Sequence, residues 1–243
     1  MSVTITPRRF SGLIHIPDAD LSFAHFAAAA AVTSGGSVDL LGLDPEDNNV
    51  FFGFLEKMGC NVRWEQVPLQ QTPEGRVPLG EDIIEELHPF GLHALGVQLP
   101  GLHFAEWRVT VSRNGSIVGR EFDLKDTPDL LPVLAAVACF AKGDTTIVNI
   151  PNRDTHKAAS ITVIAEELKK LGVMITELND GLVIHGTGKI TQSPLTLNAH
   201  SDPLLVMALA CTALGCPRPV EIIGAESVET QFPELLEMLA DPD

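Results

Sequence analysis

Three stretches of the chain are apolar at almost every position, are rich in alanine and end in glycine. They run from Phe23 to Gly36, from Leu130 to Gly143 and from Leu204 to Gly215. A helix that is apolar on every side is stable only when it is buried on every side. Short β-branched stretches follow the three runs, at Ser37–Leu41, Thr145–Ile150 and Val220–Ile223. The pattern therefore predicts three buried helices, each leading into a strand.

Residues that favour helix ends flank the three runs. Acidic or hydroxyl side chains, which cap helix N-termini, precede each run; they are Asp20 and Ser22, Thr127 and Asp129, and Ser201 and Asp202. Pro128 and Pro203 suit a first helical turn. The closing glycines suit helix C-termini, where a left-handed residue is needed. We therefore expect a side-chain cap at each N-terminus and a left-handed glycine at each C-terminus.

A second helix, amphipathic this time, is predicted after each strand. The first starts at Asp44 and ends at Gly59, the second is capped by Thr155 and ends at Gly172, and the third, Phe232–Leu239, is short. The spacing of positive and negative residues in the second helix predicts an ion pair one turn apart, between Glu166 and Lys170. Further strands are predicted at Asn61–Trp64, Val173–Glu177 and Leu182–His185.

The repeating unit is thus helix, strand, helix, strand, strand, used three times, which defines an α/β fold with buried helices. Residues 66–106 lengthen the first unit and are rich in proline, glycine and histidine, so we expect an insertion or long loop there. Because no segment resembles a linker, one domain over residues 1–243 is predicted.

Composition and charge limit the classes of function. The formal net charge is -16, which makes nucleic acid a poor partner because phosphate contacts need clustered lysine and arginine. No apolar run is long enough to span a membrane. The four cysteines form no Cys-x-x-Cys pair and no spacing with histidine that suits zinc. These features predict a cytoplasmic protein with reduced thiols, without a metal or other cofactor.

Five segments resemble one known family, in the family's order and spacing. Three carry short motifs: Ile16–Phe26 resembles a Val-Pro-Gly-Asp-x-Ser-Ser-Ala segment, Phe54–Gly59 a Leu-x-x-Met-Gly helix end, and Pro128–Pro132 a Pro-Asp-x-x-Pro segment. Ala165–Gly172 resembles the helix after the family's central signature, and Ile222–Leu236 its closing segment. The family is that of 5-enolpyruvylshikimate-3-phosphate (EPSP) synthase, and the resemblance is to its C-terminal half.

The resemblance implies a fold and a chemistry. Members have two inside-out α/β barrel-like domains of three repeats each, with helices inside, sheets outside and a catalytic cleft between the domains. They transfer an enolpyruvyl group from phosphoenolpyruvate to a phosphorylated alcohol. Because both substrates are anions, that chemistry needs fixed arginines and lysines.

Asp129 aligns with the family aspartate that is thought to abstract the hydroxyl proton. The resemblance makes it the candidate general base. An acidic residue at a helix start is equally explained as a cap or as a partner of the helix dipole. Both interpretations of Asp129 remain open from the sequence.

The family's central signature, Arg-x-Lys-Glu-Ser/Thr-Asp-Arg, is not preserved. Asp154 stands at its first arginine, His156 and Lys157 at its Lys-Glu pair, and Ser160 at its last arginine. A shifted loop would still bring Arg153, His156 and Lys157 to an anionic substrate, which makes these three the candidate substrate-binding residues.

Two further cationic positions differ. Asp202-Pro203-Leu204 replaces the family's Asp-His-Arg, and Thr230 replaces a lysine near the C-terminus. Four of the family's cationic positions, Asp154, Ser160, Leu204 and Thr230, are therefore neutral or acidic here.

Three functions follow as hypotheses. The first is an EPSP-synthase-like domain that is not catalytically competent alone and acts through protein contacts or as a homo-oligomer. The second is the C-terminal half of a split or truncated enolpyruvyl transferase of the shikimate pathway, with a separate N-terminal half as partner. The third is a diverged binder of a different small molecule. A phosphorylated small molecule is an expected ligand only if the anion site works.

Overall fold

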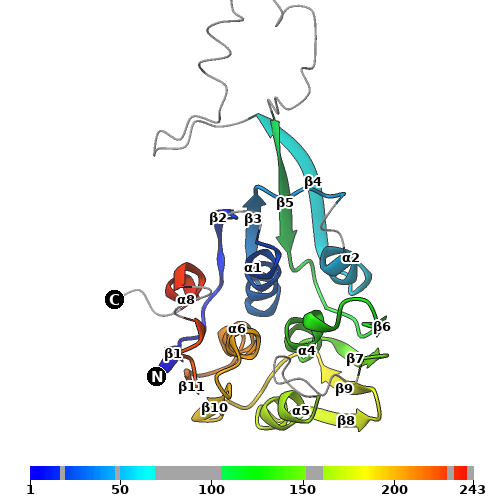
Figure 1. Cartoon of the computed structure of the whole chain (residues 1–243), viewed down its shortest axis with the longest axis vertical. Coiled ribbons are helices and arrows are strands. Elements are labelled where there is room, and N and C mark those ends of the chain that lie inside the picture. Colours follow the sequence, from blue (N-terminus) through cyan, green and yellow to red (C-terminus); the bar gives the residue numbers. More distant parts are fainter. Residues whose placement is uncertain (17–19, 47–49, 69–104, 152–160, 229–232, 240–243) are drawn as a thin grey trace, which may run out of the picture.

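The computed structural model describes residues 1–16, 20–46, 50–68, 105–151, 161–228 and 233–239. Figure 1 shows three helices in the centre, with three small sheets and the remaining helices around them. Helices therefore lie inside and sheets outside, which agrees with the arrangement that the sequence resemblance implies.

The central helices are buried on every side. They are α1 (Leu21–Ser34), α4 (Leu131–Ala138), which a 3-10 turn η4 (Pro128–Leu130) precedes, and α6 (Pro203–Leu214). In α1 the side chains of Ala27–Ala31 have no solvent exposure. Small side chains let the three helices approach closely, and the predicted burial of all three runs is confirmed.

Two of the sheets repeat one topology. The first holds, in spatial order, β2 (Ser11–His15), β3 (Ser37–Leu41), β5 (Ala105–Ser112) and β4 (Asn61–Pro68). The second holds β6 (Glu121–Asp123), β7 (Lys142–Val148), β9 (Gly181–Thr187) and β8 (Met174–Leu178). In each sheet the first pair is parallel and the other two pairs are antiparallel. The repeat is thus real, and each unit starts with a strand that the sequence pattern did not predict.

The third sheet is completed by the start of the chain. It consists of β10 (Thr196–Asn198) and β11 (Val220–Ile223), which are parallel, and β1 (Ser2–Ile5), which is antiparallel to β11. Strand β1 occupies the position that β5 and β9 hold in the other two sheets. The third unit is therefore built from both ends of the described chain.

Three peripheral helices pack against the sheets or the central helices. They are α2 (Val50–Lys57), α5 (Ile161–Lys169) and α8 (Pro233–Leu239). Asp44, predicted to start the first of these, accepts a hydrogen bond from the Glu46 N–H (2.8 Å) in a turn, and residues 47–49 between this turn and α2 lie outside the described residues. Thr155, predicted to cap the second, lies outside the described residues. No described helix has the length and apolar character needed to cross a membrane.

The predicted helix ends are partly right. Asp20 and Asp202 cap α1 and α6, but Thr127 makes no side-chain cap bond. Gly35, one residue before the predicted Gly36, is left-handed at the end of α1 (φ 74°), whereas Gly215 at the end of α6 is not (φ -92°). Helix α4 ends before its predicted glycine, because the chain turns after Ala138 and enters β7 at Lys142.

The expected insertion is shorter than predicted at both ends. Residues 66–68 belong to β4 and residues 105–106 to β5, and the two strands pair as far as Pro68 and Ala105. Residues 69–104 lie outside the described part of the chain.

A buried carboxylate joins α5 to the third sheet. The side chain of Glu167 is only 3% exposed and accepts hydrogen bonds from Lys170 Nζ (2.7 Å) and from the backbone N–H of Asn198 (2.8 Å). The ion-pair partner of Lys170 is therefore Glu167 and not Glu166, because the residue three positions before Lys170 faces β10 while Glu166 faces solvent.

We expect Glu167→Ala to lower the free energy of unfolding by roughly 1–3 kcal/mol, because it leaves the Asn198 N–H without its acceptor. The matched control is Glu166→Ala on the neighbouring, exposed position, which should change it by less than about 0.5 kcal/mol. Urea denaturation of both variants measures the difference. Equal losses in the two variants would show that the buried carboxylate does not join the two elements.

Candidate functional site

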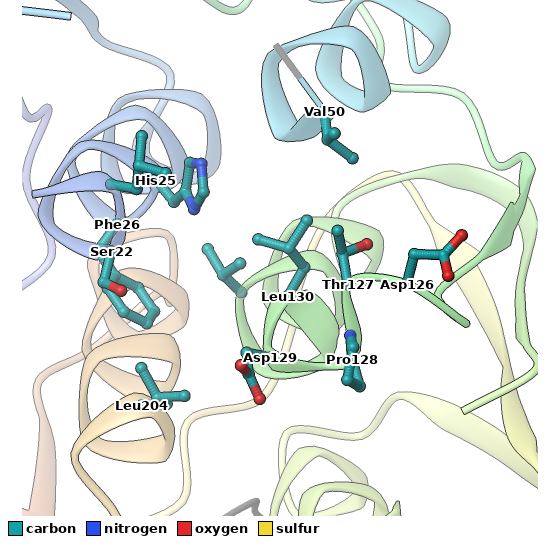
Figure 2. Close-up of a pocket in the computed structure, with 12 residues that line it drawn as sticks. Ser22, His25, Phe26, Val50, Asp126, Thr127, Pro128, Asp129, Leu130 and Leu204 are labelled. Carbon is teal, nitrogen blue, oxygen red and sulfur yellow. The ribbon is translucent and has the colours of Figure 1, made fainter. Parts of the chain in front are cut away.

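A pocket of about 380 Å³ opens where the central helices begin. Figure 2 shows side chains from the first turns of α1 and α6, from η4 and from the start of α2 around it. The lining residues are Leu21, Ser22, His25, Phe26, Val50, Asp126, Thr127, Pro128, Asp129, Leu130, Val133 and Leu204. Because the N-terminal residues of all three central helices reach one pocket, the helices point the same way and their N-termini meet there.

The chain's own carboxylates occupy two of these N-termini. Asp20 Oδ1 accepts hydrogen bonds from the N–H groups of Ser22 (2.8 Å) and Phe23 (3.1 Å). Asp202 Oδ1 accepts from Leu204 (2.9 Å) and Leu205 (3.1 Å) in the same way. Free N–H groups at a helix start bind phosphate or carboxylate readily. Here those groups already have acceptors, so α1 and α6 offer little to an anionic ligand.

Asp129 lies in η4, at the start of the α4 run, and its exposed carboxylate lines the pocket. In Figure 2 this carboxylate points toward the side of the pocket where Leu204 lies. It makes no hydrogen bond to any described residue. Asp129 is thus a first-turn acid and not a side-chain cap, and it is accessible to a ligand in the pocket.

His25 projects from α1 into the pocket (Figure 2) and was not identified as a site residue from the sequence. Its ring contacts Phe51 and Phe52, with centroids 5.0 and 5.9 Å apart. Burial lowers the pKa of His25 to about 4, so the imidazole is neutral at neutral pH. In the sequence, His25 is a single polar residue within an apolar run, and only the packing of α2 against α1 encloses it.

Positive charge is missing from the part of the pocket that the structure describes. Its lining includes Asp126 and Asp129 but no lysine or arginine. Leu204, which the sequence resemblance aligns with a family arginine, contributes an apolar side chain. The predicted substrate-binding residues Arg153, His156 and Lys157 lie outside the described residues, as do Asp154, Ser160 and Thr230.

A second polar cluster lies on the outer face of the β6–β9 sheet. His185 Nδ1 is 2.9 Å from Asp144 Oδ1, and His185 Nε2 is 3.0 Å from Thr176 Oγ1. Asp144 and His185 are directly opposite each other in the β7–β9 register, and Thr176 is on the adjacent strand. Cross-strand pairing accounts for the cluster, and none of its residues lines the pocket.

Comparison with known proteins agrees with this architecture. Among solved structures, EPSP synthase from Acinetobacter baumannii matches 90% of this chain with a TM-score of 0.67 and 20% identity, and the match covers 44% of that protein. The enolpyruvyl transferase NikO from Streptomyces tendae matches 91% of this chain with a TM-score of 0.60 and 19% identity, and the match covers 43% of that protein. The fold is therefore that of the enolpyruvyl transferases.

The sequence comparison assigns the family. The model of the EPSP synthase (3-phosphoshikimate 1-carboxyvinyltransferase) family matches residues 92–239, and the chain belongs to this family. The 3-phosphoshikimate 1-carboxyvinyltransferases of Acetivibrio thermocellus and Syntrophobacter fumaroxidans are each 31% identical, over 91% and 95% of this chain. The matches cover 43% and 45% of those proteins, so the chain spans less than half of their length.

The position of Asp129 predicts a small effect on stability. Because its carboxylate interacts mainly with the helix dipole, Asp129→Ala should lower the free energy of unfolding by less than about 1 kcal/mol. Asp20→Ala removes an acceptor from two N–H groups and should cost about 1–2 kcal/mol. Thermal unfolding of the two variants checks the order. A larger loss for Asp129→Ala would mean that this residue holds the η4 turn.

The pKa of His25 predicts a pH dependence of stability. The unfolded chain protonates this residue near its ordinary pKa of 6.5, whereas the folded protein resists protonation until about pH 4. The unfolded state therefore binds more protons between these values, and His25 makes the fold less stable as pH falls through this window. The contribution reaches about 1.4 kcal/mol per pH unit.

His25→Phe should remove that contribution, because phenylalanine suits the contacts with Phe51 and Phe52 and does not titrate. Urea denaturation at a series of pH values from 7.5 to about 4.5 should give a shallower decline for the variant than for the unmodified protein. Parallel declines would mean that water reaches the imidazole of His25 and that its pKa is not lowered.

Proposed function

We propose that this chain is an EPSP-synthase-like domain that does not catalyse enolpyruvyl transfer on its own. One observation carries the proposal: the described lining of the pocket holds Asp126 and Asp129 but no cation. The candidate base lines the pocket, and no residue of the described lining would neutralise an anionic substrate next to it.

The chemistry of the transfer explains why this matters. Relatives of the chain carry the name of an enzyme acting on 3-phosphoshikimate, which has a phosphate and a carboxylate group, and the family's other substrate, phosphoenolpyruvate, has the same two groups. Loss of one donor to a developing negative charge commonly costs about 2.7–4 kcal/mol of transition-state stabilisation. The N–H groups at the starts of α1 and α6 do not replace such donors, because Asp20 and Asp202 already accept from them.

A second candidate function is the C-terminal half of a two-chain enolpyruvyl transferase of the shikimate pathway. Two observations favour it: Asp129 is exposed at an open pocket, and the chain spans less than half of its relatives. In this arrangement a separate N-terminal half covers the pocket and supplies cations. Arg153, His156 and Lys157 would be this chain's own contribution to anion binding, and both halves would work in the cytoplasm.

The experiment measures phosphate release from phosphoenolpyruvate in the presence of 3-phosphoshikimate. We expect the purified chain to release no phosphate above a protein-free blank, because the described lining of its pocket holds no cation to neutralise either substrate. The full-length relative from Syntrophobacter fumaroxidans, assayed in parallel, establishes that the substrates and conditions support turnover.

Two outcomes would change the conclusion. Phosphate release by the chain alone that disappears in Asp129→Asn would overturn the proposal and make Asp129 the base of a competent enzyme. Release that appears only with a second chain, co-purified from the source cells, would replace the first function by the two-chain enzyme.

A further inference from the structure

We propose that the pocket at the starts of α1, η4 and α6 binds a small organic ammonium compound with an apolar or aromatic body. The inference rests on the proposed function, because it requires that the pocket has ceased to hold the family's anions. Three features of the described residues support it: the apolar walls, the sign of the charge around the mouth, and the state of His25.

The walls suit an apolar molecule of modest size. Most of the lining side chains are apolar, namely Leu21, Phe26, Val50, Pro128, Leu130, Val133 and Leu204. The volume of about 380 Å³ lies in the range of roughly 300–1,000 Å³ that small-molecule pockets occupy. Transfer of a single aromatic ring from water into such a pocket is favourable, because it removes apolar surface from water.

The charge at the mouth favours a cation. Each helix N-terminus contributes roughly +0.5 of an elementary charge, so the three together contribute about +1.5. Among the described residues, three carboxylates oppose them: Asp126 and Asp129 in the lining, and the cap Asp20. Since each carboxylate carries a full negative charge, the acids outweigh the helix dipoles. A ligand ammonium group beside Asp129 is therefore attracted, and a carboxylate or phosphate is repelled.

His25 adds a polar group that carries no charge. Its imidazole is enclosed by Phe51 and Phe52 on one side and faces the pocket on the other, and it makes no hydrogen bond to any residue that the structure describes. A neutral imidazole accepts a hydrogen bond from an N–H or O–H group through one ring nitrogen and donates through the other. The inner part of the pocket therefore has a hydrogen-bonding group for a ligand but no charge to attract an anion.

The test uses three compounds of matched shape and different charge: benzylamine, benzyl alcohol and benzoate. Their dissociation constants for the full chain are measured at pH 7 and low salt by titration followed by NMR. We expect benzylamine to bind about tenfold more tightly than benzyl alcohol, and benzoate to bind most weakly. Because the carboxylates are exposed, the preference for benzylamine should shrink when salt is raised.

Variants and ring signals locate the binding. Asp129→Asn should weaken benzylamine several-fold and leave benzyl alcohol unchanged, whereas Asp180→Asn, an exposed control on the β8–β9 turn, should change neither. The ring nitrogens of His25 should shift as benzylamine saturates the protein, while those of His185 on the outer sheet face should not. His25→Phe identifies the His25 signals by their loss.

Equal affinities for the three compounds, tightest binding of benzoate, or shifts that spare His25 would each overturn the inference. None of these results bears on enolpyruvyl transfer, which the phosphate-release assay decides separately. Benzoate preference without phosphate release would reject the ligand class and keep the proposed function. Phosphate release by the chain alone would reject the proposed function, and with it the premise of this inference.

Discussion

Close packing of three helices that are apolar on every side is the constraint on which the rest of the molecule depends. Their C-terminal ends leave almost no free space: a Cβ on Gly215 would lie 2.5 Å from the Phe140 ring and 2.7 Å from the Thr33 carbonyl oxygen. Thr33 Oγ1 donates to the carbonyl of Cys211 (2.6 Å), and Cys211 Sγ donates to that of Phe26 (3.3 Å), so α1 and α6 are also joined by hydrogen bonds. With the helices held side by side and pointing the same way, their N-termini meet at the other end, and the pocket is a consequence of the core.

The part of the fold that depends on the composition of single segments could be predicted from the sequence. An all-apolar run such as Leu204–Gly215 has few structural alternatives, and the strand after each run follows from its β-branched residues. Strand β5 was missed because its start falls in the segment that the sequence predicts as an insertion. Strands β1, β2, β6 and β10 were missed because each is only three to five residues long and is held by a partner far along the chain. Pairing of that kind leaves little local pattern.

A site residue could be predicted where it belongs to a sequence motif, and it could not where only the packing of distant helices places it at the pocket. Asp129 follows from the Pro-Asp-x-x-Pro segment, and the structure places it at a pocket, while its role as a base stays a prediction. His25 becomes a pocket residue only because Phe51 and Phe52 of α2 cover one side of it. The partner of Lys170 was assigned to Glu166 because helical spacing alone does not show which carboxylate faces a neighbouring strand.

The third sheet has a consequence for how the molecule folds. Each of the other two sheets is made from a continuous stretch of chain, but β1 pairs with β11 across more than 200 residues, from Ser2 opposite Ile223 to Ile5 opposite Val220. Closing a loop of that length is slow compared with forming local contacts. During synthesis, β1 leaves the ribosome before the two continuous sheets do, and it stays unpaired until β11 has followed. Strand β1 is thus made before the other strands of the three sheets but is among the last to be ordered, and its late docking completes the third sheet.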